Sequence, residues 1–338
     1  MNYLLTFIFA LIISLILTPL SRKLAIALSI YDHPLSDVKT HKKATPYLGG
    51  VAIAGSFLAA LLLIRLFTHF PTGTLRSLRG IFIGSIVILM LGLFDDIKHK
   101  GLKFQSKFIF QAIPCIVLLI FNIKLKFITP EWLAITLTII WVIGVINALN
   151  IIDIMDGLSS GIAIIACLGF FLIGIPQEEE IYVNFASIAL AGACLGFLPY
   201  NLSHKYKIFM GDTGSLFIGF ILAAISMGTK YTEVNNLGLF APILILAIPI
   251  YDTFLVMYLR IKKRTSPFIG SKDHFALRLE KTGYSRKSIL FFTYTAGIIL
   301  SFTSFLVTIV NLYSAVTIYM FTVFIALYTA RELGKIKI

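Results

Sequence analysis

The sequence predicts an all-α membrane protein that crosses the bilayer many times. Apolar residues fill 58% of the 338 positions and charged residues only 13%, whereas soluble domains carry about 25% charged residues. Apolar stretches of roughly 17 to 25 residues, the length that a helix needs to cross a bilayer, recur along the whole chain. Because helices satisfy their own backbone hydrogen bonds in lipid, we expect one multi-pass helical domain over residues 1–338.

Eleven apolar stretches are expected to form transmembrane helices. They cover residues 3–20, 47–68, 79–94, 105–122, 132–149, 158–174, 184–200, 214–229, 238–259, 288–310 and 314–330. No Lys or Arg precedes the first stretch, which favours a retained helix over a cleaved signal peptide. The three cysteines lie inside apolar stretches without metal-ligand or disulfide spacing, so we expect them to be packing residues.

The basic residues predict which side of the membrane each loop occupies. Most follow odd-numbered stretches or lie in the C-terminal tail. Only six of the 29 Lys and Arg residues fall elsewhere, namely Arg65, Arg76, Arg79, Lys124, Lys126 and Lys230. The positive-inside rule then places the basic loops in the cytoplasm, the N-terminus outside and the C-terminus inside. We expect a multi-pass protein of the plasma (inner) membrane.

The aspartates gather on the predicted cytoplasmic side. Those in loops or at helix ends are Asp32, Asp37, Asp95, Asp96, Asp153, Asp156, Asp212 and Asp273. Asp252 lies about two helical turns inside the 238–259 stretch. A preference of Asp for loops and helix caps does not explain why none faces outward. The distribution therefore predicts a site on the cytoplasmic face.

The first inner loop has the composition of a phosphate-binding segment. Lys39, His41 and Lys43 come shortly before Gly49 and Gly50, where a backbone without Cβ atoms allows close approach of a ligand. A basic cluster attracted to anionic lipid explains this loop equally well.

The pair Asp95-Asp96 stands where the 79–94 stretch leaves the membrane. Adjacent carboxylates repel each other unless a cation lies between them or one is protonated. The pair therefore suits a divalent metal or a general base, although adjacent acids also occur on solvated helix ends.

Asn147, Asn150, Asp153 and Asp156 recur at every third position. If the helix continues through them, they share one side of it. A row of amide and carboxylate oxygens at the membrane edge suits a hard cation such as Mg²⁺.

Asp212 belongs to the Gly-rich segment GDTGS, directly before the 214–229 stretch. A turn that begins a helix offers free N–H groups to a phosphate, and Asp212 could meet a metal there. The alternative is a simple N-cap. The long basic loop before the 288–310 stretch adds His274 and Arg278 as candidate phosphate ligands.

Taken in this order, the motifs resemble the polyprenyl-phosphate N-acetylhexosamine-1-phosphate transferase superfamily (glycosyltransferase family 4). The resemblance runs from about Asp32 to Ser285. The superfamily includes enzymes that act on UDP-GlcNAc and undecaprenyl phosphate, and phospho-MurNAc-pentapeptide translocase. Eleven helices with the N-terminus outside are similar to the GlcNAc branch, whereas the translocase branch has ten.

The resemblance implies a role for each matching residue. It implies that Asp212, Asn150 and Asp153 bind Mg²⁺, with Mn²⁺ as a possible substitute. Asp95 and Asp96, with Asp153, are implied to be catalytic. The implied nucleotide-sugar ligands are Lys39, His41, Lys43, Asp156, Asn201, Phe209, His274 and Arg278, with Phe209 stacked on uracil.

The chain departs from the family pattern at two places. Where the family often reads Asp-Gly-x-Asp-Gly, Ile154 and Met155 separate the two aspartates. The two further histidines of the family's histidine motif are replaced by Ala276 and Leu277. We expect these departures to change the nucleotide pocket and the recognition of the sugar more than the type of reaction.

The resemblance implies transfer of a sugar 1-phosphate from a UDP-sugar to polyprenyl phosphate with release of UMP, the first membrane step of a cell-envelope glycan such as lipopolysaccharide or teichoic acid. UDP-GlcNAc is the expected donor; another UDP-N-acetylhexosamine and UDP-MurNAc-pentapeptide are the alternatives. Attack is expected to be direct, with a covalent aspartyl intermediate as the alternative. The acceptor lipid is expected in a groove near Asp252. No nucleic-acid partner is expected, and a homodimer is left open.

Two other classes of protein compete with this interpretation. An ion-coupled transporter would explain a buried acid such as Asp252, but the chain shows no internal repeat and its acids gather at one face. A membrane scaffold would not need the ordered set of polar residues. Substrate-dependent UMP release would distinguish the enzyme from both.

Overall fold

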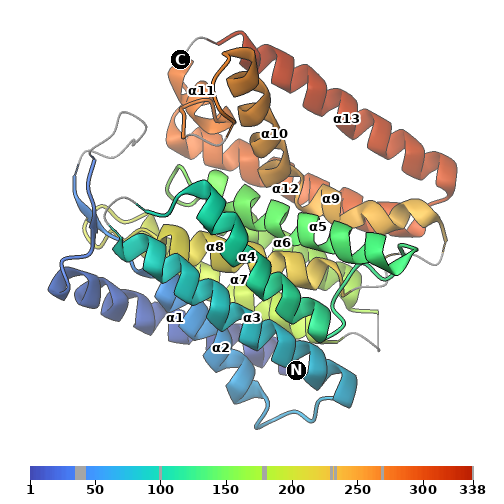
Figure 1. Cartoon of the computed structure of the whole chain (residues 1–338), viewed down its shortest axis with the longest axis horizontal. Coiled ribbons are helices and arrows are strands. Elements are labelled where there is room, and N and C mark those ends of the chain that lie inside the picture. Colours follow the sequence, from blue (N-terminus) through green and yellow to red (C-terminus); the bar gives the residue numbers. More distant parts are fainter. Residues whose placement is uncertain are drawn as a thin grey trace.

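The structure, a computed structural model, describes residues 1–34, 43–98, 101–176, 181–228, 231, 234–267 and 270–336. It is a bundle of helices with one small hairpin (Figure 1). The elements are α1 (Asn2–Ala27), β1 (Tyr31–Asp32), β2 (Thr45–Pro46), α2 (Gly49–Ile64), α3 (Thr72–Ile97), α4 (Phe104–Ile120), α5 (Glu131–Ile151), α6 (Leu158–Gly174), α7 (Tyr182–Asn201), α8 (Gly211–Ser226), η1 (Asn236–Phe240), α9 (Ala241–Ile245), α10 (Ala247–Lys262), α11 (Phe275–Lys281), α12 (Arg286–Ile309) and α13 (Leu312–Gly334).

The prediction of an all-α membrane protein is confirmed, and every predicted stretch coincides with helix. Among the described residues, six helices are long and apolar enough to cross a membrane, or seven if the bent pair η1–α9 and α10 forms one span. The helices α2, α4, α6 and α8 have only 16 or 17 residues. At 1.5 Å per residue they measure about 25 Å, against a hydrocarbon core of about 30 Å. Eleven crossings, and the side on which each terminus lies, stay predictions.

The prediction of one continuous helix over 238–259 is wrong. This stretch is divided into η1, α9 and α10, and the two parts are bent by 73° at Leu246. Proline causes such breaks because it lacks an N–H and its ring clashes with the carbonyl four residues earlier. Pro249 stands three residues after the break and four after Ile245, so a helix that continued through Ile245 would lose one hydrogen bond and clash with the proline ring. The short helix α11 and the antiparallel pairing of β1 with β2 are also additions to the predicted elements.

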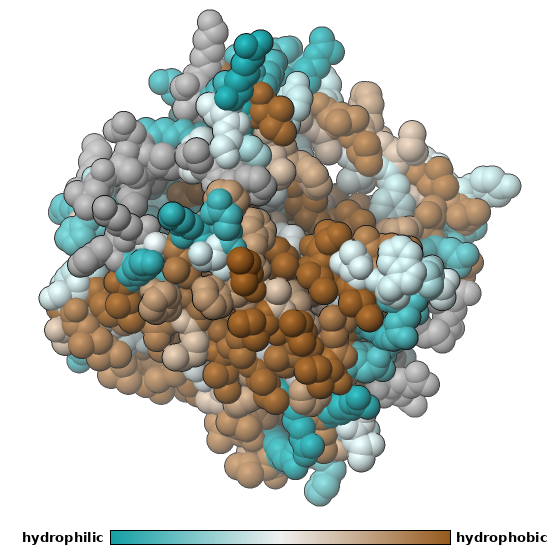
Figure 2. Space-filling model, in the orientation of Figure 1, coloured by the Kyte–Doolittle hydropathy of each residue, from teal (hydrophilic) through white to brown (hydrophobic). Residues whose placement is uncertain are grey.

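The centre of the bundle is formed by α7 and α8. Most of α7 is buried, and nearly every residue of α8 is, whereas α13 lies at the edge, where Ala315 is its one fully buried residue. Figure 2 shows a broad hydrophobic area over the face where α3, α4 and α5 lie, with hydrophilic residues gathered at its edges. This pattern is that of a bundle whose outer surface meets lipid.

Close contacts between helix backbones bring the polar ends of the helices together. A Cβ atom at Gly50 of α2 would overlap the backbone of Gly214 in α8, and one at Gly219 of α8 would lie 2.6 Å from the Cα of Ile146 in α5. Small residues permit such approaches between membrane helices. As a result, the start of α8 is held against the ends of α2, α3 and α5.

Candidate active site

A polar pocket of about 830 Å³ lies where the ends of α3, α5 and α8 meet. Eight of the thirteen predicted site residues line it: Asp95, Asp96, Asn150, Asp153, Asp156, Asn201, Phe209 and Asp212. These residues come from three segments that are far apart in the sequence, 95–96, 150–156 and 201–212. The structure therefore brings most of the predicted site into one cavity.

Asp96 caps the N-terminus of α8. Its buried carboxylate accepts hydrogen bonds from the backbone N–H of Asp212 (2.8 Å) and from the N–H (3.0 Å) and hydroxyl (2.5 Å) of Thr213. Gly211 has a φ of +70°, and a Cβ there would overlap the Asp96 carboxylate. A helix N-terminus stabilises a carboxylate in the same way as a phosphate. The Asp96 carboxylate therefore occupies the position at the start of α8 where the sequence suggested a phosphate.

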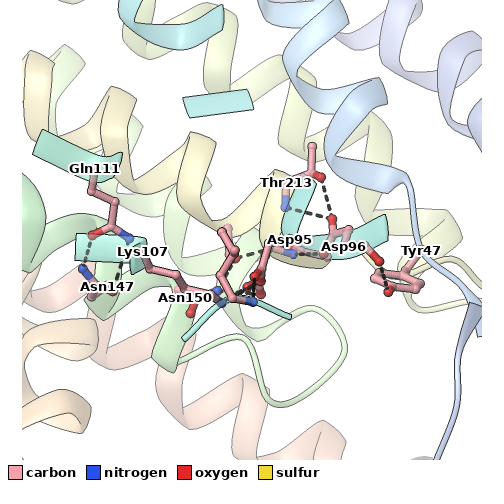
Figure 3. Close-up of polar contacts among 12 residues, drawn as sticks. Tyr47, Asp95, Asp96, Lys107, Gln111, Asn147, Asn150 and Thr213 are labelled. Atoms are coloured by element: carbon pink, nitrogen blue, oxygen red, sulfur yellow. Dashed lines mark hydrogen bonds and ion pairs between the residues drawn. The ribbon is translucent and has the colours of Figure 1, made fainter. Parts of the chain in front are cut away.

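Lys107 of α4 bridges two further carboxylates of the site, those of Asp95 and Asp212 (Figure 3). Its Nζ atom lies 2.6 Å from Asp95 and 2.5 Å from Asp212. Asp95 also accepts a hydrogen bond of 2.5 Å from the backbone N–H of Leu102. The sequence interpretation missed Lys107, although a charged residue inside an apolar stretch is costly in lipid and therefore signals a functional or paired group.

An amide network extends the site along α5 (Figure 3). The Asn150 amide donates to the Asp212 carboxylate and to the hydroxyl of Ser215, both at 2.9 Å. One turn earlier, the Asn147 amide donates to the oxygen of the fully buried Gln111 at 2.7 Å. Since buried amides need partners, these pairs fix the relative positions of α4, α5 and α8.

The predicted row of four polar residues on one helix side is wrong for its second half. The helix α5 ends at Ile151, and Asp153 and Asp156 lie in the turn that leads to α6. Gly157 completes this turn with a φ of +79°. Burial raises the pKa of Asp153 to about 8, and the negative charges of Asp212 and Asp156 add to the effect. The turn thus points a second pair of acids into the pocket.

The opposite wall of the pocket combines an aromatic ring with an ion pair. Lys207 Nζ lies 2.6 Å from the Asp156 carboxylate and 5.1 Å from the centre of the Phe209 ring. Asn201 accepts a hydrogen bond from the Gly157 N–H (2.7 Å) and donates to the Ile208 carbonyl (3.1 Å). Asn201 therefore holds the two loops of this wall together. Lys207 lines the pocket and is a second site residue that the sequence interpretation missed.

His274 and Arg278 have protein partners outside the residues that line the pocket. His274 Nδ1 lies 2.7 Å from the Asp252 carboxylate, which also accepts the Phe275 N–H at 2.9 Å. The buried Arg278 guanidinium donates to Asp273, at its carboxylate (2.5 Å) and its carbonyl. It also donates to two carbonyl oxygens at the end of α13, those of Leu333 (2.9 Å) and Ile336 (2.6 Å).

These contacts fasten α11 to α10 and α13. Burial raises the pKa of Asp273, but hydrogen bonds from Lys263 and Arg278 outweigh it, so the net pKa lies below the usual value for Asp. Ser271 and Leu277 of the same segment line the pocket. The ligand roles of His274 and Arg278 stay predictions.

The basic loop before α2 is described only in part. Lys39 and His41 lie outside the described residues. Lys43 is described, and its carbonyl accepts a hydrogen bond of 3.0 Å from the Thr45 hydroxyl. Tyr47, the next pocket residue along the chain, donates its hydroxyl hydrogen to the Asp96 carbonyl.

Comparison with known proteins shows the family to which the chain belongs. The profile of glycosyl transferase family 4 matches residues 78–230. A probable undecaprenyl-phosphate N-acetylglucosaminyl 1-phosphate transferase of Bacillus subtilis is 30% identical over 88% of this chain and 83% of its own length. The chain belongs to glycosyl transferase family 4.

Two further relatives represent different branches of glycosyl transferase family 4. A decaprenyl-phosphate N-acetylglucosaminephosphotransferase of Mycolicibacterium smegmatis is 30% identical over 86% of this chain and 78% of its own length. A phospho-N-acetylmuramoyl-pentapeptide-transferase of Listeria innocua is 34% identical over 66% of this chain and 74% of its own length. All three relatives are named as transferases, which favours an enzyme over the transporter hypothesis.

The donor atoms of this family member fit a hard cation. Mg²⁺ is commonly held by one or two carboxylates, with substrate phosphates and water completing the shell. Asp95 and Asp212 already converge on one positive charge, the Lys107 ammonium. Among the described residues, no three His, Cys, Asp or Glu side chains form a preassembled metal site. The carboxylate pair therefore suits an ion that arrives with a phosphate-bearing substrate.

Proposed function

We propose that this protein transfers GlcNAc 1-phosphate from UDP-GlcNAc to undecaprenyl or another polyprenyl phosphate and releases UMP. The proposal rests on one observation: the two walls of one pocket differ in their chemistry. One wall holds Asp95 and Asp212, both paired with Lys107, and the other holds Lys207 and Phe209. The first wall suits a pyrophosphate group and the second a nucleoside base, which are the two parts of a UDP-sugar.

The reaction requires an anion to attack an anion. An oxygen of the acceptor phosphate attacks the phosphorus that bears the sugar, the pyrophosphate P–O bond breaks, and UMP leaves with the bridging oxygen. The Lys107 ammonium lies between two carboxylates, where it can turn to a developing negative charge without crossing the pocket. Asp95 is placed to orient the acceptor phosphate or to accept its proton.

A bound Mg²⁺, or Mn²⁺ in its place, would be held by Asp212 with Asn150 and Asp153 and would neutralise charge on the transferring phosphate. Asn150 already orients the Asp212 carboxylate. Direct attack is favoured over an aspartyl intermediate, because hydrogen bonds engage Asp96 at the start of α8 and Lys107 pairs with Asp95.

UDP-GlcNAc is favoured over UDP-MurNAc-pentapeptide on two grounds. The Bacillus subtilis and Mycolicibacterium smegmatis relatives align over more of this chain than the Listeria innocua relative does. The chain also has Ala276 and Leu277 at two positions of the family's histidine motif. The protein would act at the cytoplasmic face of the plasma membrane, in the first membrane step of an envelope glycan.

The test is to incubate purified protein with undecaprenyl phosphate, Mg²⁺ and a panel of UDP-sugars, and to measure UMP and the lipid product. We expect the most product with UDP-GlcNAc. Asp212→Ala should reduce UMP release by about a thousandfold or more, because it removes a group that organises charge in the transition state. Glu332→Gln, at an acid exposed near the C-terminus, is the matched control and should keep full activity. Normal turnover of Asp212→Ala would contradict the site assignment.

A further inference from the structure

The two residues of the proposed nucleoside wall, Lys207 and Phe209, belong to a segment without regular secondary structure. This segment, residues 202–210, connects α7 to α8. The Lys207 side chain pairs with Asp156 and lies over the Phe209 ring. Because the backbone here has no helix or strand of its own, its shape depends on hydrogen bonds to the elements around it. Those hydrogen bonds therefore determine where both side chains of the nucleoside wall stand.

The start of α2 holds the last two residues of this segment. The backbone N–H groups of Gly49 and Gly50 donate to the carbonyl oxygens of Phe209 (3.0 Å) and Met210 (2.9 Å), and the Phe209 N–H donates to the Pro46 carbonyl (3.0 Å). A Cβ atom at Gly49 would lie 2.7 Å from the Phe209 oxygen. The close approach that the two glycines allow is thus used by the protein's own backbone.

The two residues before them are held by side chains. The Ile208 carbonyl accepts a hydrogen bond from the Asn201 amide (3.1 Å), and the Lys207 carbonyl accepts one from Nε–H of Arg22 in α1 (3.2 Å). Asn201 lines the pocket, whereas Arg22 lies outside the described lining. Among the described contacts to the four carbonyl oxygens of residues 207–210, the Arg22 contact is therefore the one made by a side chain outside the pocket lining.

The helix α1 is fastened to α7 by contacts that do not involve Arg22. The Ser14 hydroxyl donates to the Ala193 carbonyl at 2.7 Å, and the Tyr200 hydroxyl donates to the Leu15 carbonyl at 2.9 Å. Arg22 follows Ser14 by about two helical turns, so a packed helix carries its guanidinium to the segment. A group held by a rigid element in this way can fix the position of a flexible site segment.

The basic residues at the end of α1 could also serve only as a membrane anchor. Lys23, the neighbour of Arg22, is exposed as an anchor would be. Arg22 is only partly exposed, because its side chain reaches the Lys207 carbonyl. The two neighbours therefore differ in their surroundings, although they look alike in the sequence.

We propose that Arg22 is a positioning residue for the nucleoside of the donor. Through the Lys207 carbonyl, Arg22 holds the Lys207 and Phe209 side chains where the base binds. The inference rests on the proposed function, because it takes the wall of Lys207 and Phe209 to bind the nucleoside. Arg22 precedes residues 78–230, the part of the chain that the family profile matches. The amino-terminal helix thus contributes to donor affinity without touching the donor.

The test separates the hydrogen bond of Arg22 from its charge. Arg22→Met removes both, whereas Arg22→Gln removes the charge and keeps an N–H donor, because the Gln amide nitrogen is as many bonds from Cα as Nε of Arg. Lys23→Met is the matched control, since it removes the same charge from an exposed position on the same helix end. Dissociation constants of UDP and of uncharged uridine are measured with purified protein in detergent. Because α1 keeps its contacts to α7, all three variants should fold.

We expect Arg22→Met to weaken the binding of UDP and of uridine by the same factor, about fivefold to tenfold, because the segment loses one hydrogen bond from a charged donor. Arg22→Gln and Lys23→Met should bind both ligands like the native protein. In assays of UMP release, Arg22→Met should raise KM for UDP-GlcNAc by that factor. Its kcat and its KM for undecaprenyl phosphate should not change.

Three results would overturn the proposal. Native-like binding by Arg22→Met would leave Arg22 a membrane anchor. A loss of UDP affinity without a loss of uridine affinity, or an equal loss in Arg22→Gln, would mean that the charge of Arg22 acts on the phosphates. In each of these cases the native protein still binds UDP, so the proposed function stands. If the native protein bound neither UDP nor uridine, the proposed function would lose its donor, and the positioning role of Arg22 would fall with it.

Discussion

Two clusters of charged residues in this protein differ in how their charges are used. At the active site, one ammonium, that of Lys107, is shared by Asp95 and Asp212 at the edge of a cavity. At the corner formed by α10 and α11, the Arg278 guanidinium is enclosed and donates to Asp273 and to the end of α13. A ligand can exchange with the first set of contacts, whereas the second set is part of the fold. Charge clustering alone does not distinguish these roles, because both clusters look alike in the sequence.

The largest expected effect of breaking the first cluster comes from Lys107→Met. It leaves two neighbouring carboxylates without a cation and removes a positive charge from the transferring phosphate, so kcat should fall by about 100-fold to 1000-fold. Measurement of UMP release at saturating substrates checks this. Lys103→Met, at an exposed lysine directly before the same helix, is the control and should retain activity. Activity near the native level would show that Lys107 only holds the resting site together.

Substitution in the second cluster should lower the stability of the fold and leave catalysis unchanged. Arg278→Met leaves Asp273 buried with one partner fewer and removes the donors to the Leu333 and Ile336 carbonyl oxygens, which should cost about 3–5 kcal/mol of folding free energy. A lowered thermal midpoint in detergent, with KM for UDP-GlcNAc unchanged in the folded fraction, is the expected result. Arg331→Met, at an exposed arginine of α13, should change the midpoint little. A large rise in KM with unchanged stability would instead assign Arg278 to the substrate.

The smallest expected effect concerns the nucleoside wall. Lys207→Met removes one of the cations that line the pocket, worth about 1 kcal/mol to a nearby phosphate, so UDP should bind about fivefold more weakly. Lys205→Met is a close control, since Lys205 also lies over an aromatic ring, that of Tyr206, but outside the described lining. Tighter UDP binding by Lys207→Met would mean that Lys207 covers the Phe209 ring and must be displaced by the base.

Much of the site could be predicted because its acids stand in short motifs. Asp95, Asp96, Asp153, Asp156 and Asp212 all reach the predicted pocket. Their separate tasks could not be predicted in the same way. Asp96 is a helix cap because the start of α8, more than a hundred residues later, is packed against it.

The hydrophobic patterning of the sequence was sufficient to predict an all-α, multi-pass membrane protein, because membrane helices satisfy their hydrogen bonds within one segment and expose local apolar surface. Only the tertiary structure decided which charges face each other. Lys107 and Asp212 are 105 residues apart, and they meet only because α3, α4, α5 and α8 pack side by side.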